Sequence, residues 1–202
     1  MRRTEVKFMA EGFQLAGFYR YLTACNATTL HPPRLVNSLY FDTATNLMLR
    51  ETFEGITPRK KYRLRWYGSG GPKPGKVSVE VKTTSSSGRE KSVSTLDPST
   101  PLLAQAELEP YGIIFPSVRV SYLREYFSLD GIRLTIDKDI KYYYPDDLES
   151  EARGLLTSAI AVEAKSPKPS LEEEFVSEIG LKTRHFSKFE QGMCHIHKFE
   201  TY

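Results

Sequence analysis

Charged side chains recur at every second position along several short segments of the sequence. A period of two places such side chains on one face of a β-strand. These faces carry eleven cations, namely Arg3, Lys7, Lys61, Arg63, Arg65, Lys82, Arg89, Lys91, Arg124, Arg133 and Lys165. They carry only four acids, namely Glu5, Glu80, Asp137 and Glu163. A solvated face usually mixes the two signs more evenly, so the excess of cations calls for a chemical explanation.

The opposite faces of the same segments are mostly apolar, as with Val77, Val79 and Val81 in one segment and Leu134 and Ile136 in another. An ordinary half-solvated sheet would account for this alternation. The alternative is a closed sheet that helices cover on its apolar outside, with the charged faces lining the interior. Buried cations without counterions would be too costly, so the interior would have to bind a polyanion, and its few acids a divalent metal. Arg and Lys together favour phosphate, and a narrow lumen suits a linear phosphate chain better than a nucleic-acid duplex.

The elements that would position these residues follow from hydrophobic periodicity and turn residues. Strands are predicted at 2–9, 35–41, 59–67, 76–84, 89–96, 119–129, 132–140 and 158–165. Helices are predicted at 11–25, 46–53, 100–111 and 171–179, and in the tail from residue 186. His31-Pro32-Pro33 is expected to break the chain, and Asp130-Gly131 to close a hairpin. The sequence therefore predicts a single α+β domain, residues 1–202, built on an antiparallel sheet.

The composition excludes several classes of protein. With 202 residues, 40% of them apolar and 26% charged, the chain is neither disordered nor collagen-like, and its two cysteines form no disulfide framework. The net charge of +3 gives no indication of nucleic-acid binding. Cys25 and Cys194 are expected to be reduced thiols. Because neither a signal peptide nor an apolar membrane-spanning segment is evident, a cytoplasmic protein is expected.

Several motifs occur in the order found in a known family. They are Arg3-Thr-Glu-Val-Lys7-Phe8, Asn37-Ser-Leu-Tyr-Phe-Asp-Thr43, Arg63-Leu-Arg-Trp-Tyr-Gly68, Val79-Glu-Val-Lys82, Tyr122-Leu-Arg124, Ile132-Arg-Leu-Thr-Ile-Asp137, Glu163-Ala-Lys165 and Phe186-Ser-Lys-Phe189. Together they resemble the catalytic domain of the vacuolar transporter chaperone (VTC) polyphosphate polymerases, from about residue 3 to residue 192. That domain belongs to the triphosphate tunnel metalloenzymes, with the CYTH-like adenylate cyclases and thiamine triphosphatases. The resemblance implies an eight-stranded antiparallel β-barrel with flanking helices, which holds a triphosphate and a manganese or magnesium ion.

The resemblance also implies roles for individual residues. The catalytic candidates are Arg63, Arg65, Lys82 and Arg124. The substrate-binding candidates are Lys7, Lys91, Tyr122, Arg133, Ser187 and Lys188, of which the last two would close the substrate end. Glu163 is the implied metal ligand, and Glu5 resembles the first-strand acid of the wider superfamily. His185 stands where the family usually has a basic residue, and Arg3 stands where the wider superfamily often has an acid, which favours the polymerase-like branch.

Three functions remain open at this stage. The leading hypothesis is a metal-dependent phosphotransferase that moves the γ-phosphoryl group of ATP to inorganic polyphosphate. The alternatives are a hydrolase of tripolyphosphate or nucleoside triphosphates, and a polyphosphate-binding module without turnover. The partners would be ATP and polyphosphate, with no nucleic acid and no membrane segment in this chain.

Three further motifs have simpler explanations. Gly70–Lys76 has the letters of a P-loop, but Val77 follows instead of Ser or Thr, so a hairpin loop is expected. Trp66 lies between two arginines and so on the opposite strand face, where a core position is expected. Cys194-His195-Ile196-His197 is expected to be a surface feature of the C-terminal tail rather than a metal site.

Overall fold

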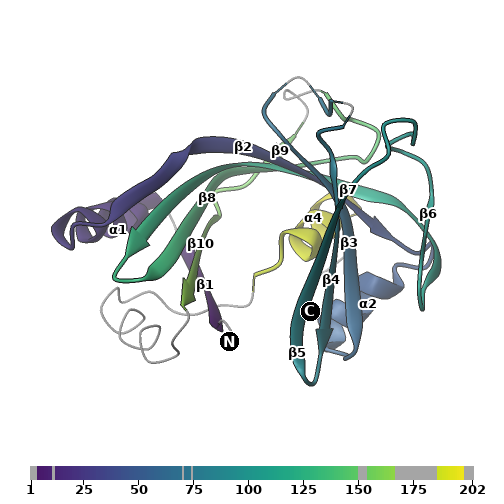
Figure 1. The fold of residues 1–202 in the computed structure, drawn as a ribbon, viewed down its shortest axis with the longest axis horizontal. Helices are drawn as coiled ribbons and strands as arrows, with labels where there is room; N and C mark the ends of the chain where they lie inside the picture. The colour runs from purple at the N-terminus through teal and green to yellow at the C-terminus, as the bar shows by residue number, and fades with distance from the viewer. Residues whose placement is uncertain are drawn as a thin grey trace. The chain divides into compact units, whose positions relative to one another are not determined.

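The computed structural model describes residues 4–10, 12–69, 71–73, 75–149, 154–166 and 186–197. The helix predicted at 171–179, together with Arg3 and His185, lies outside the described residues. The chain divides into two compact units (Figure 1). Unit 1 comprises residues 1–35, 122–140 and 156–186, and unit 2 comprises residues 36–121, 141–155 and 187–202.

The fold is the predicted α+β class, with an antiparallel sheet path of eight strands and two short added strands. The path runs β1-β10-β8-β7-β2-β3-β4-β5, while β6 pairs with β7 and β9 pairs with β8. The strands are β1 (Thr4–Ala10), β2 (Thr28–Asp42), β3 (Arg59–Tyr67), β4 (Ser78–Ser85), β5 (Gly88–Thr95), β6 (Ala106–Leu108), β7 (Gly112–Leu129), β8 (Ile132–Tyr143), β9 (Leu155–Leu156) and β10 (Ile160–Ser166). The described helices are α1 (Gly12–Ala24), α2 (Leu47–Glu54) and α4 (Lys188–His197). None of these helices has the length and apolar character that crossing a membrane requires.

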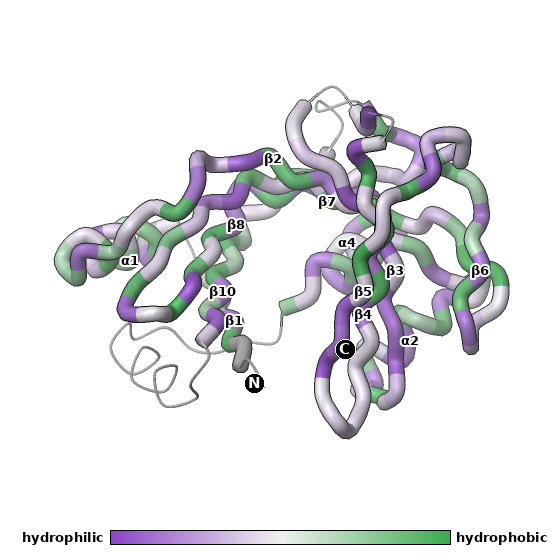
Figure 2. Tube along the Cα trace, viewed as in Figure 1, coloured by the Kyte–Doolittle hydropathy of each residue, from purple (hydrophilic) through white to green (hydrophobic). Residues whose placement is uncertain are grey.

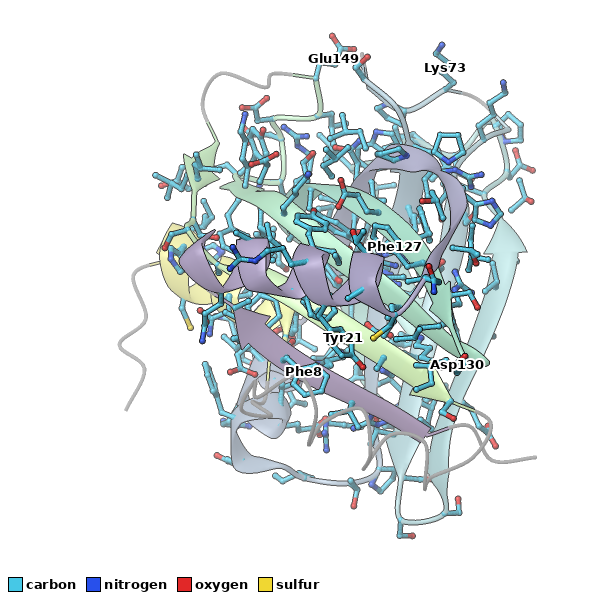
Figure 3. All side chains as sticks on the ribbon, turned by 90° about the vertical axis from the view of Figure 1, so that its left-hand side faces the viewer. Phe8, Tyr21, Lys73, Phe127, Asp130 and Glu149 are labelled. Carbon is cyan, nitrogen blue, oxygen red and sulfur yellow. The ribbon has the colours of Figure 1, made fainter. Side chains whose placement is uncertain are left out.

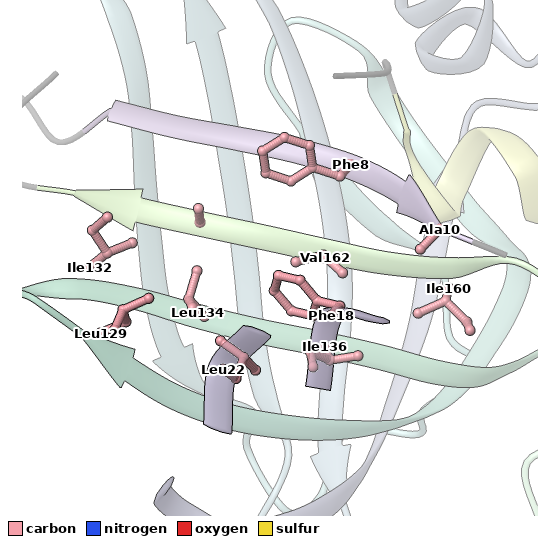
Figure 4. Close-up of a cluster of buried hydrophobic side chains, with 11 residues drawn as sticks. Phe8, Ala10, Phe18, Leu22, Leu129, Ile132, Leu134, Ile136, Ile160 and Val162 are labelled. Atoms are coloured by element: carbon pink, nitrogen blue, oxygen red, sulfur yellow. The ribbon is translucent and has the colours of Figure 1, made fainter. Parts of the chain in front are cut away.

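In unit 1, α1 covers the apolar face of the strands (Figure 3). Phe18 and Leu22 of α1 are buried against residues of β1, β8 and β10, among them Phe8, Ile136 and Val162 (Figure 4). Burying a side chain of this size contributes about 1.5–3 kcal/mol relative to leaving it exposed. The alternation of side chains along each strand then turns the charged residues to the face that α1 leaves uncovered.

The hairpin between β7 and β8 forms at the predicted dipeptide. Asp130 has φ 46° and Gly131 has φ 81°, so both central residues adopt the left-handed conformation of a type I′ turn. This turn matches the right-handed twist of the paired strands. The prediction at Asp130-Gly131 is therefore confirmed.

Unit 2 has its own apolar cluster on one face of β2, β3 and β4. Leu39, Leu64 and Trp66 are buried there with Met48 of α2, and Trp66 is only 1% exposed, which confirms its predicted core position. Asp42 accepts hydrogen bonds from the backbone N–H groups of Met48 and Leu49, which are unsatisfied donors at the start of α2. Hydrophilic stretches along β3 and β4 are visible in Figure 2.

Two sequence expectations are wrong. His31-Pro32-Pro33 does not break the chain, because β2 runs continuously through it. Proline also favours an extended conformation in the residue before it, which is compatible with a strand. Residues 100–111 form turns and β6 instead of a helix. There Leu108 is buried against Ile114, so pairing with β7 outweighs the local helical spacing.

Candidate phosphate-binding site

Cations of unit 2 recur along one face of the β3–β4–β5 sheet. Antiparallel pairing sets Lys61 opposite Lys82, and Lys82 opposite Lys91. Arg63 and Arg65 follow Lys61 at intervals of two, so they point to the same side. We call these five residues (Lys61, Arg63, Arg65, Lys82 and Lys91) the β3–β5 cation face. Like charges directly opposite one another destabilise a sheet, so this face is suited to a bound anion.

Glu80 is the acid that the structure places within the β3–β5 cation face. Its Oε2 atom lies 2.5 Å from Nη2 of Arg63 and 3.7 Å from Nη1 of Arg65. Its Oε1 atom lies 2.8 Å from Nζ of Lys91. The Glu80 side chain is 7% exposed, so one buried carboxylate is shared by three cations.

The charges of this cluster shift the pKa values of Glu80 and Lys91. Burial by itself would raise the pKa of Glu80, but the charges of Arg63 and Arg65 and a hydrogen bond from Lys91 outweigh it and lower the pKa to about 2. Burial, with a contribution from the two arginines, lowers the pKa of Lys91 although Glu80 opposes the shift. The cations are thus crowded enough to disfavour one another's charge.

We expect Glu80→Gln to destabilise the free protein by about 3 kcal/mol, because three cations lose their shared carboxylate. Since the folded pKa is below the ordinary value of 4.5, the stability that Glu80 contributes is complete above 4.5 and is lost as the pH falls toward about 2. The same variant should bind tripolyphosphate more tightly. Urea unfolding with and without tripolyphosphate measures both effects.

Glu90→Gln is the matched control, because Glu90 precedes Lys91 on β5 and points to the opposite face. It should change stability by no more than about 0.5 kcal/mol. If the two variants behaved alike, Glu80 would not be the counter-charge of the cation face.

Strand β2 adds two hydroxyl groups to the same face. Tyr40 is paired with Arg63, and Ser38 with Arg65. The Nη1 atom of Arg63 donates to the Tyr40 hydroxyl at 2.8 Å, and the Nε and Nη2 atoms of Arg65 donate to Ser38 Oγ at 3.3 and 3.2 Å. Hydrogen bonds to β2 therefore help to fix the orientation of both guanidinium groups.

The first residues of α4 also contact the β3–β5 cation face. Lys61 Nζ donates to Ser187 Oγ at 2.9 Å and lies 5.6 Å from the centre of the Phe189 ring. Ser187 Oγ accepts from the Glu190 N–H at 3.4 Å, as an N-cap residue does. The charge of Lys188 acts on the buried Tyr40 hydroxyl. Ser187 and Lys188 therefore lie beside residues of the β3–β5 cation face and of β2, while their predicted role at the substrate end stays a prediction.

Unit 1 has a separate charged face on β1, β7, β8 and β10. Arg124 makes a bidentate contact with Asp137, with Nε to Oδ1 at 2.5 Å and Nη2 to Oδ2 at 2.7 Å. Asp137 is 1% exposed. The Arg124 guanidinium lies 5.2 Å from the centre of the Tyr122 ring. The charge of Asp137 and its hydrogen bonds help to raise the pKa of Arg124 despite burial, so the pair is firmly ionic.

Glu163 lies on the same face of unit 1. It is paired with Lys7 across β1 and β10, and its Oε1 atom lies 2.7 Å from Lys165 Nζ. Burial would raise the pKa of Glu163, but the charges of Lys7, Lys165 and Arg124 lower it well below the ordinary value. Glu163 is therefore a carboxylate at neutral pH.

Two candidates of unit 1 remain, Arg133 and Glu5. Arg133 is exposed, with its guanidinium 5.9 Å from the centre of the Tyr126 ring. The backbone of Glu5 is paired with Lys165, but its side chain lies outside the described part of the structure. The role of Glu5 as a metal ligand therefore stays a prediction.

The oxygen donors of unit 1 are suited to a hard divalent ion. Glu163 and Asp137 occupy the same face of the adjacent strands β10 and β8, since Asp137 is paired with Ala161. Within the described ranges, no group of three or more His, Cys, Asp or Glu side chains gathers. Because both oxygens of Asp137 accept from Arg124, Glu163 is the described carboxylate of this face that fits manganese or magnesium, with phosphate oxygens and water completing the coordination.

The structure thus places the predicted residues in two groups. Unit 2 holds Arg63, Arg65, Lys82, Lys91, Ser187 and Lys188, and unit 1 holds Lys7, Tyr122, Arg124, Arg133 and Glu163. The expectation that one cavity gathers residues of both groups stays a prediction. Sequence reasoning gave no role to Tyr40 or Ser38, and it counted Asp137 only among the acids of the charged faces. The signal for the first two was available, because Ser38-Leu-Tyr40 repeats the period of Arg63-Leu-Arg65.

Comparison with known protein families shows to which family the chain belongs. The family model of the VTC domain matches residues 13–107 and 104–197. The chain belongs to the VTC domain family. No curated protein matches the chain.

Several solved structures have a fold similar to that of this VTC domain. A Hippeastrum protein, HpAC1, whose dominant activity is that of a triphosphatase, superimposes with a TM-score of 0.54 at 16% identity over 96% of each chain. An adenylate cyclase-like protein from Bacillus halodurans gives a TM-score of 0.57 at 13% identity over 93% of this chain and 96% of its own. A protein from Pyrococcus horikoshii gives 0.55 at 13% identity over 94% and 97%. The VTC domain described here has the fold of the triphosphate tunnel proteins.

Proposed function

We propose that this VTC domain is a metal-dependent phosphotransferase that moves the γ-phosphoryl group of ATP to the end of an inorganic polyphosphate chain. The observation that carries the proposal is the β3–β5 cation face, where Lys61, Lys82 and Lys91 are directly opposite one another. Glu80 lies among these cations and is shared by Arg63, Arg65 and Lys91. The excess of positive charge on a sheet face suits a substrate that carries several negative charges in a row.

Phosphoryl transfer requires positioning and charge neutralisation more than covalent chemistry. Arg63 and Arg65 would hold and neutralise the transferring group, with Lys82 and Lys91 on the neighbouring phosphates. Arg124 supplies a fixed guanidinium in unit 1, with Lys7, Arg133 and Tyr122 as further phosphate ligands. Ser187 and Lys188 would contact the substrate from the start of α4. The terminal phosphate of a polyphosphate chain is already anionic, so chain growth needs no general base.

A divalent ion, manganese or magnesium, would supply charge neutralisation and orientation of phosphate oxygens. Glu163 would hold it, together with Glu5. The role of the protein is then to keep Glu163 ionised, which Lys7 and Lys165 achieve by lowering its pKa.

Phosphorus NMR of the purified protein with ATP and manganese tests the proposed reaction directly. The expected result is a growing signal from internal polyphosphate phosphates together with ADP. Orthophosphate and ADP without a polyphosphate signal would identify a hydrolase, and an unchanged spectrum would leave only the binding module, so either would contradict the proposal. Arg63→Ala and Arg124→Ala, assayed in the same way, test whether each charged face takes part.

A further inference from the structure

Arg63 and Arg65 of β3 are each held by a neutral group on the neighbouring strand β2, and Arg63 also pairs with Glu80. Tyr40 is the register partner of Arg63, and Ser38 is the register partner of Arg65. The hydroxyl group of each accepts hydrogen bonding from its arginine. Both hydroxyl residues are buried, Ser38 with 0% and Tyr40 with 6% of the residue exposed. The two contacts are therefore made inside the protein, where a poorly satisfied donor is costly.

The partners are neutral hydroxyl groups, so they do not reduce the positive charge of the guanidinium groups that they contact. A carboxylate that contacts a guanidinium offsets part of its charge, as Asp137 does for Arg124 in unit 1 and Glu80 does for Arg63. A hydroxyl orients the guanidinium and leaves the positive charge for a ligand. Arg65 is the clearer case, because its distance to Glu80 is 3.7 Å whereas it donates twice to Ser38 Oγ.

Tyr40 has a further contact that Ser38 does not have. Its ring lies 5.4 Å from the ring of Phe189, so the side chain that holds Arg63 also packs against α4. Burial would raise the pKa of the Tyr40 phenol, but Arg63, Arg65 and Lys188 lower it below the ordinary value. Tyr142 also interacts electrostatically with Tyr40. Tyr40 is thus enclosed by the cations whose arrangement it supports.

We propose that Tyr40 and Ser38 are positioning residues for phosphate binding, which hold the guanidinium groups of Arg63 and Arg65 in the orientation that a polyphosphate chain requires. This inference rests on the proposed function. Neither hydroxyl needs to touch the substrate. The two hydroxyl groups act through the arginines. They raise the affinity for the phosphate chain without changing the charge of the site.

Tyr40→Phe removes only the hydroxyl and provides the first test. We expect it to weaken tripolyphosphate binding, measured by calorimetry in the presence of a chelator, by about tenfold. Tyr62→Phe is the matched control, because Tyr62 lies next to Arg63 on β3 but packs against Phe41 in the apolar cluster. It should leave the affinity unchanged. Ser38→Ala should resemble Tyr40→Phe and provides an independent variant.

A double-mutant cycle separates positioning from a purely structural role. In an Arg63→Ala background, Tyr40→Phe should have no further effect on affinity, because the group through which it acts is gone. The dependence of affinity on salt should be the same for wild type and Tyr40→Phe, since no charge has been removed, and weaker for Arg63→Ala. Circular dichroism of each variant verifies that it is folded.

The outcomes distinguish the inference from the function on which it rests. If the wild type fails to bind tripolyphosphate, the proposed function is wrong. If the wild type binds it and Tyr40→Phe binds equally well, the function stands and the positioning role is wrong. An equal loss from Tyr40→Phe in the wild-type and Arg63→Ala backgrounds would also overturn the positioning role.

Discussion

Tripolyphosphate should raise the melting temperature of this protein by about 5–10 °C. A ligand at 100 times its Kd stabilises the folded state by about 2.7 kcal/mol, and 1 kcal/mol corresponds to about 2–4 °C for a chain of this size. The physical reason is that the bound anion relieves the repulsion among Lys61, Lys82 and Lys91, which are directly opposite one another on three strands. Differential scanning calorimetry at low ionic strength, without divalent metal, measures the shift.

Two adjacent lysines of β3 provide the control for this shift. Lys61 belongs to the β3–β5 cation face, whereas Lys60 points to the other side of the strand and donates to the backbone carbonyl of Glu109. Lys61→Ala should lose part of the tripolyphosphate shift, and Lys60→Ala should keep it. The shift should decrease with added salt. No shift for the wild type at low ionic strength would exclude the polyanion ligand altogether.

Glu163→Gln should abolish metal-dependent turnover and leave metal-free anion binding intact or slightly tighter. The substitution keeps the volume of the side chain but removes the charge that a divalent ion needs. Because a negative charge leaves an anion site, the affinity for tripolyphosphate in chelator should not fall. Turnover with manganese and calorimetric titration with tripolyphosphate in chelator measure the two properties separately.

Glu125→Gln is the matched control for Glu163→Gln. Glu125 belongs to unit 1 as well, but it accepts hydrogen bonds from Tyr19 of α1 and from Lys138, on the helix-covered face of the sheet. The same change of charge there should leave metal-dependent turnover intact. If Glu163→Gln instead loses anion affinity in chelator, Glu163 is a structural partner of Lys7 and Lys165, and Glu5 becomes the next candidate for the metal.

Local sequence was sufficient to predict most strands and the direction of their side chains. The alternation in 59–67 and 132–140 depends only on the period of a strand, and the turn at Asp130-Gly131 depends on two residues that tolerate positive φ. Where the local pattern failed, a distant strand was the cause. Residues 100–111 have helical spacing, but β6 pairs with β7 because Leu108 is buried beside Ile114.

The sequence by itself determined which side chains are candidates for phosphate binding and on which side of each strand they lie, because both follow from residue type and a period of two. Only the tertiary structure decided their partners. Tyr40 reaches Arg63 across 23 positions of the chain, and Ser187 reaches Lys61 across 126. Such pairs depend on strand register and on the packing of α4. A shift of one residue in the register of β2 can place an apolar side chain instead of a hydroxyl opposite each arginine, although the local pattern of the sequence would be unchanged.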